Sequence, residues 1–109
     1  MDERTLNIGL DLAMEFGPNW LEPIQGRLGK RFPQLSPIEL DEYDRVCREA
    51  MNFGHNQVVP CERESKGDRH AAFELFKQNV LGCYPWVSKD NLDHMYSQGW
   101  YYAMKDGDL

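Results

Sequence analysis

The stretch that decides the fold is LSPIELDEYDRVCREAMNFGH, residues 35–55. Ser36 is a good helix N-cap, Pro37 suits the first helical position, and Glu39 completes a capping box three residues after the cap. The apolar side chains that follow recur every three or four residues, which is the period of a helix with one buried face: Leu40, Tyr43, Cys47, Ala50 and Met51. Gly54 matches the left-handed residue that commonly ends a helix. The stretch therefore predicts an amphipathic helix over residues 36–54.

Two further helices are predicted towards the C-terminus. Residues 68–82 begin with Asp68 as a candidate N-cap and end at Gly82, with apolar residues at helical spacing between them. Residues 88–105 begin with Ser88 as N-cap, and Lys105 lies near the end, where the helix dipole favours a cation.

The first third of the chain gives a mixed pattern. Residues 6–16 alternate apolar and other side chains, as a strand would, but their composition favours a helix. The best partner for a strand, residues 57–59, stops at Pro60, so we expect a helix buried on more than one side and keep the strand as the alternative. Residues 19–32 predict another helix, because four apolar residues stand four apart: Trp20, Ile24, Leu28 and Phe32.

These elements predict an all-α fold, a bundle of about four to five helices in a single domain, residues 1–109. The chain is 41% hydrophobic with a formal charge of −6, a composition typical of a soluble globular protein. It shows no apolar run long enough to cross a bilayer and does not begin like a signal peptide, so we expect no membrane partner. Three cysteines without close spacing indicate reduced thiols and a cytoplasmic location.

The segment GHNQVVPCERESKGDRH, residues 54–70, contains two of the three histidines and one of the three cysteines. Its central part, residues 55–67, is predicted to be a long connector between helices, and long connectors are often functional. One hypothesis is a small-molecule, metal or catalytic site formed by His55, Cys61 and His70, with Arg63 lowering the pKa of the thiol. Nothing in the spacing requires these residues to meet, so the simpler prediction is a solvated connector.

No cofactor or metal site is predicted elsewhere. His70 and Glu74 stand four apart on one predicted helix, as Asp90 and His94 do on the next, but at about 100° per residue both pairs fall away from the apolar faces. The chain shows no phosphate-binding loop, zinc knuckle or catalytic triad motif. We therefore expect a binding function rather than catalysis.

Nucleic-acid binding is a third hypothesis, based on Arg27, Lys30 and Arg31 around a Gly-x-x-Gly pattern at residues 26–29. Such a pattern arises easily by chance. The acidic charge of the chain also disfavours contact with phosphate backbones, so we rank this hypothesis last.

The C-terminal aromatic residues give the favoured hypothesis. Trp100, Tyr101 and Tyr102 are consecutive, so on a helix they point about 100° apart and cannot all enter one core. Exposed Tyr and Trp side chains are enriched at interfaces. We therefore predict a homodimer or a protein-binding surface along this helix, with Tyr96 and Trp86 as neighbours.

Overall fold

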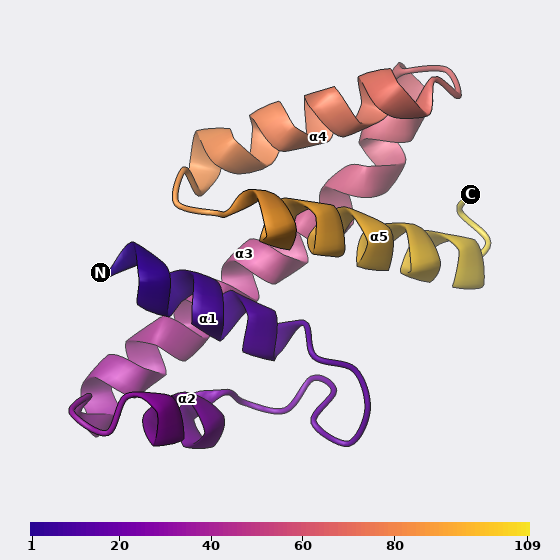
Figure 1. Cartoon of the computed structure of the whole chain (residues 1–109). Coiled ribbons are helices and arrows are strands. Elements are labelled where there is room, and N and C mark those ends of the chain that lie inside the picture. The colour runs from indigo at the N-terminus through magenta and orange to yellow at the C-terminus, as the bar shows by residue number, and fades with distance from the viewer. The chain divides into compact units, whose positions relative to one another are not determined.

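The computed structural model describes residues 1–109, which form five α-helices and no strand (Figure 1). The helices are α1 (Glu3–Ala13), α2 (Gln25–Arg31), α3 (Pro37–Glu64), α4 (Arg69–Cys83) and α5 (Lys89–Lys105). The predicted all-α fold of four to five helices is confirmed. None of these helices has both the length and the apolar character that a membrane span requires. The chain divides into two compact units, residues 1–51 and 52–109, and α3 contributes one half to each.

Helix α1 shows that residues 6–16 are helical up to Ala13, as expected, and not a strand. Its N-cap is Asp2, whose carboxylate accepts a hydrogen bond from the Thr5 amide at 2.8 Å. The apolar side chains that it buries recur every three or four residues, at Leu6, Leu10 and Ala13, and the cap residue Met14 is buried beside them. The alternating pattern arises because the remaining apolar residues, Ile8 and Leu12, are half-buried on the flanks of a broad apolar face.

The helix predicted over residues 19–32 is shorter than expected. Helix α2 covers only its second half, and Trp20 lies in the preceding turns. Leu21 adopts a left-handed conformation with a φ of 63°, and Pro23 disfavours helical backbone at the residue before it. These two residues explain why the helix begins only after Ile24, although its apolar spacing starts earlier.

Helix α3 starts as predicted but does not end at Gly54. The capping box is present, because the Glu39 amide donates to Ser36 Oγ at 3.1 Å and the Ser36 amide donates to Glu39 Oε1 at 2.9 Å. The helix then continues to Glu64, so the predicted connector over residues 55–67 is wrong and the true link spans residues 65–68. Gly54 does not end the helix: a Cβ at this position would overlap the Met95 side chain, so the glycine allows close packing between α3 and α5.

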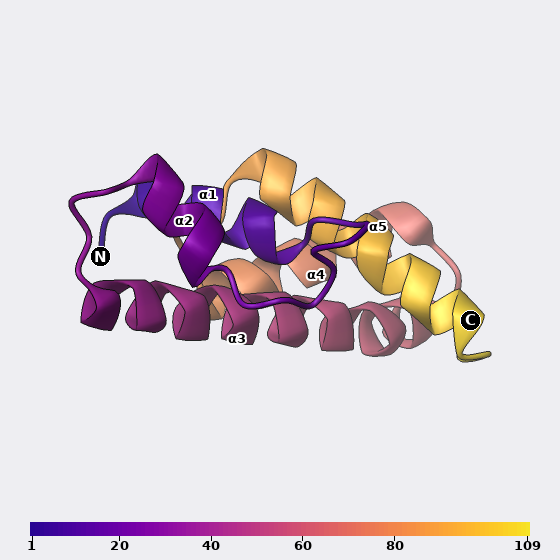
Figure 2. The same ribbon diagram turned by 90° about the horizontal axis from the view of Figure 1, so that it is seen from below.

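Pro60 lies inside α3, where the sequence suggested a break. Figure 2 shows α3 as one continuous helix. A proline inside a helix costs about 3 kcal/mol or more, because it lacks an N–H and its ring crowds the carbonyl four residues earlier. The helix continues because Val58 and Cys61 extend the buried stripe, so burial on both sides of Pro60 offsets this cost.

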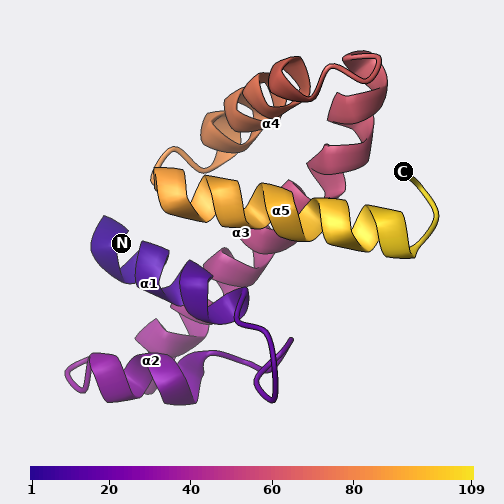
Figure 3. The same ribbon diagram turned by 45° about the vertical axis from the view of Figure 1, so that its right-hand side comes forward.

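The second unit combines the later half of α3 with α4 and α5. The predicted caps are confirmed: Asp68 accepts from the Ala71 amide at 3.1 Å, and Ser88 Oγ accepts from the Asn91 amide at 3.3 Å. Helices α4 and α5 diverge from their short link, and α3 crosses beside α5 (Figures 1 and 3). A Cβ on Gly99 would lie 2.4 Å from Val58 Cγ2, so Gly99 permits the close approach of α5 to α3.

Candidate functional site

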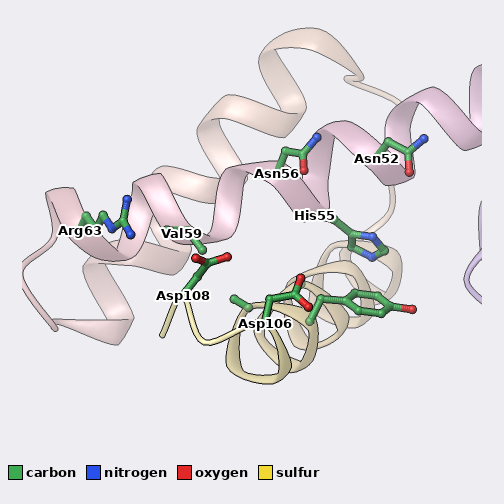
Figure 4. A pocket seen from close by; sticks show the side chains of 10 residues that line it. Asn52, His55, Asn56, Val59, Arg63, Asp106 and Asp108 are labelled. Carbon is green, nitrogen blue, oxygen red and sulfur yellow. The ribbon is translucent and has the colours of Figure 1, made fainter.

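The second unit contains a hollow of about 460 Å³ between α3 and the C-terminal end of α5 (Figure 4). Helix α3 contributes one wall from successive turns: Asn52, His55, Asn56, Val59 and Arg63. The C-terminal turns of α5 and the residues after it contribute the other: Gly99, Tyr102, Ala103, Asp106 and Asp108. The hollow is therefore rich in polar side chains, and all of them belong to one unit of the chain.

A Schellman motif places the two carboxylates of this hollow. Gly107 has a φ of 80°, its amide donates to the Met104 carbonyl at 3.2 Å, and the Asp108 amide donates to the Ala103 carbonyl at 2.8 Å. This pair of hydrogen bonds turns the chain back at the end of α5. As a result Asp106 and Asp108 face α3 across the hollow (Figure 4).

His55 lines the hollow and begins a row of polar contacts that runs through the buried Gln98 to His94. Its Nε2 lies 3.1 Å from Gln98 Oε1, and the Gln98 amide nitrogen lies 3.3 Å from His94 Nε2. Gln98 is only 2% exposed. Burial lowers the pKa of His55, so the ring is neutral at neutral pH. In the tautomer that this arrangement requires, Nε2–H donates to Gln98 and leaves Nδ1 as an acceptor.

The polar side chains on the α3 wall are not engaged within the chain. Asn52, Asn56 and Arg63 form no side-chain hydrogen bond or ion pair with other residues. Arg63 therefore lines the same hollow as Asp106 and Asp108 without pairing with either carboxylate. Charges of both signs in one hollow can bind groups of both signs on a ligand.

The hypothetical site of His55, Cys61 and His70 is not assembled. Cys61 lies six residues after His55, roughly 240° around the same helix, and its Sγ lies 3.7 Å from the Asn79 amide nitrogen on α4. Burial raises the pKa of the Cys61 thiol, which makes it a poorer nucleophile. His70 is exposed in the first turn of α4, so of the three residues only His55 lines the hollow.

The histidine and carboxylate pairs considered for metal binding do not converge. His70 and Asp90 are exposed. His94 was predicted to face outward, which is wrong, because it is half-buried beside Gln98. No three His, Cys, Asp or Glu side chains lie close enough together to hold a metal ion.

The three consecutive aromatic residues of α5 point in three directions. Tyr101 is 53% exposed, and Met104 on the next turn is 61% exposed. Trp100 is half-buried beneath the Arg69 guanidinium, whose Cζ lies 4.1 Å from the centre of the Trp100 ring. Tyr102 packs against His55 with 5.4 Å between the ring centres. Tyr101 and Met104 therefore form an exposed apolar pair, which we call the α5 patch.

Tyr96 and Trp86, predicted as neighbours of this surface, lie elsewhere. Tyr96 is buried and donates a hydrogen bond to Glu62 Oε1 at 2.7 Å, and Glu62 itself is only 6% exposed. Burial raises the pKa of Tyr96 to about 12. Trp86 is half-buried in the link before α5, edge-to-face with Tyr84. Tyr96 therefore belongs to the core of the second unit.

The basic residues considered for nucleic-acid binding lie in the first unit. The Gly-x-x-Gly pattern lies within α2 instead of forming a loop. The Arg27 guanidinium is engaged by Glu15 Oε2 at 2.8 Å and by the Leu12 carbonyl at 2.9 Å. Lys30 and Arg31 are exposed in the last turn of α2, where the helix dipole favours cations.

Several residues of the hollow were missed by sequence reasoning, because residues 55–67 were predicted to be a connector. The available signal was the helical spacing of Asn52, Asn56, Val59 and Arg63, which continues through Pro60. The Lys105-Asp-Gly-Asp sequence was a second signal, since glycine directly after a helix end is typical of a Schellman motif.

Comparison of the chain with protein families, with curated proteins and with solved structures found no match. Its fold and its side chains define it as a small all-α protein with an exposed apolar patch and a polar hollow on the same helix.

Proposed function

We propose that this protein is a protein–protein interaction module that self-associates through the C-terminal end of α5. The observation that carries the proposal is the α5 patch, in which Tyr101 and Met104 are each more than half exposed on adjacent turns. Tyrosine and methionine are enriched in interfaces because they bury a large area. All three cysteines are free thiols, which supports a cytoplasmic location for this module.

A second copy of the chain is a suitable occupant because the two kinds of side chain in the patch can pack on each other across a two-fold axis. In a two-fold contact, if one residue of the first copy touches a second residue of the other copy, the reverse contact between the same two positions forms as well. Tyr101 of one copy can thus pack on Met104 of the other, and the reverse contact forms at the same time. Contacts between a thioether and an aromatic ring are favourable. A patch of two side chains is small, so we expect weak, concentration-dependent association.

The test is sedimentation velocity over a wide concentration range. The average mass of the wild-type chain should rise with concentration, whereas a Tyr101→Ser, Met104→Gln double variant should remain a monomer. Ile38→Ser is a matched control, because Ile38 is 81% exposed on another helix and should not affect the mass. A wild-type chain that stays monomeric at every concentration would exclude self-association and leave a different protein as the partner. Equal association of the double variant would exclude the α5 patch.

A further inference from the structure

The polar hollow of the second unit supports a separate inference, which does not depend on self-association. Figure 4 shows Asp106 and Asp108 on the wall opposite α3, with Arg63 towards one end and His55 towards the other. We propose that this hollow binds a small zwitterionic molecule, an α-amino acid or a short peptide. Its carboxylate would pair with Arg63, and its ammonium group would pair with Asp106 and Asp108.

The charges of the hollow fit such a ligand because the Arg63 guanidinium forms no ion pair with Asp106 or Asp108. A guanidinium binds a carboxylate through two parallel hydrogen bonds, and the Arg63 guanidinium is not occupied by any carboxylate of the chain. An ammonium group needs acceptors for three N–H bonds. Asp106 and Asp108 provide carboxylate oxygens on the opposite wall.

The floor of the hollow fits the rest of the ligand. Val59, Gly99 and Ala103 are small and apolar, which leaves room for an aliphatic side chain. His55 and Tyr102 close one end with their rings, and His55 Nδ1 can accept one more hydrogen bond. A volume of about 460 Å³ lies in the range of known small-molecule sites.

The first experiment uses L-leucine, L-leucinamide and N-acetyl-L-leucine as probes in isothermal titration calorimetry, followed by the other common amino acids and Leu-Leu. L-Leucinamide lacks the carboxylate, and N-acetyl-L-leucine lacks the ammonium group. We expect at least one zwitterion to bind, and its two blocked forms to bind at least about tenfold more weakly, the loss typical of a charge-assisted contact. If no zwitterion binds at millimolar concentration, or if blocked and free forms bind equally, the proposal is overturned.

Variants then test the walls. Arg63→Gln and Asp108→Asn should each weaken binding of the same zwitterion at least about tenfold. Lys105→Gln is the control, because Lys105 is exposed and does not line the hollow. The melting temperature of each variant separates a binding defect from misfolding. Unchanged affinity in both Arg63→Gln and Asp108→Asn would overturn the proposal. The Tyr101→Ser, Met104→Gln variant should bind normally, which distinguishes this site from the α5 patch.

Discussion

The two units bury different kinds of side chain. In residues 1–51, the one buried polar residue is Thr5, which satisfies its hydroxyl locally by donating to Asp2 at 2.7 Å. In residues 52–109, the buried polar residues are Glu62, Asn91 and Gln98. Burying such groups is unfavourable unless they are hydrogen-bonded, so the core of the second unit depends on more hydrogen bonds between side chains. Sites for chemistry and recognition are therefore best sought in the second unit.

The units also differ in how closely their helices approach. A Cβ on Gly9 would lie 2.8 Å from Cys47 Sγ and 3.3 Å from Ile24 Cδ1, so its nearest contact is longer than those at Gly54 and Gly99. The same addition at Gly54 would meet three side-chain atoms of the buried Met95, and at Gly99 it would meet the stiff Val58. The second unit should therefore tolerate added volume less well than the first.

The largest expected effect comes from Gly99→Ala. The added methyl group should force α5 away from α3 and lower the free energy of unfolding by about 1–3 kcal/mol, even though alanine favours helices. Gly9→Ala in the first unit is the matched variant and should cost less. Urea unfolding, with amide hydrogen exchange of α1 and α5 to separate the units, measures both. If Gly99→Ala were as stable as the wild type, the close approach of α5 to α3 would not be required.

The next effect concerns the buried hydroxyl of Tyr96. Tyr96→Phe removes the only hydrogen-bond donor to the Glu62 side chain and should lower stability by about 1–3 kcal/mol. In the first unit, the Tyr43 hydroxyl accepts from the amide of the exposed Asp2 at 3.2 Å, so Tyr43→Phe should cost less than about 1 kcal/mol. Equal losses for the two variants in urea unfolding would remove the distinction between the two cores.

A smaller effect of opposite sign is expected at Gly26. This glycine lies in α2 of the first unit, and a Cβ there would meet nothing within 4 Å. Gly26→Ala should therefore raise stability by about 0.5–1 kcal/mol, because alanine loses less backbone entropy in a helix. A rise in melting temperature checks this, and a fall would show that α2 needs the freedom of glycine.

The smallest effect is the pH dependence due to His55. Burial lowers the pKa of His55 in the folded chain below its ordinary value of 6.5. Above pH 6.5 the ring is neutral in both states, and its full contribution to stability is present. As the pH falls from 6.5 through the lowered folded pKa, the unfolded chain binds the proton more readily and stability is lost.

Urea unfolding at a series of pH values between 7.5 and 5 measures this loss. The loss should be reduced in His55→Gln. His70→Gln, which replaces an exposed histidine on α4, is the control for the substitution itself. A His55→Gln variant with the full pH dependence of the wild type would assign the effect to groups other than His55.

The candidate site was predicted only in part from the sequence. Spacing predicted that Trp100, Tyr101 and Tyr102 could not share one core, and the structure places them in three environments. Spacing could not predict which of the three is exposed, because that depends on what α3 and α4 place beside α5. The hollow around His55 was missed for the same reason: its two walls are more than thirty residues apart in the sequence.

The sequence by itself determined where three of the helices begin. The caps at Ser36, Asp68 and Ser88 are confirmed because each is a hydrogen bond between residues three apart, which needs no distant partner. The tertiary structure decided where α3 ends. Gly54 and Pro60 are local signals that a helix ends, but burial of Val58 and Cys61 against other elements stabilises the continued helix. The free energy of that burial depends on residues distant in the sequence, so a local pattern cannot predict it.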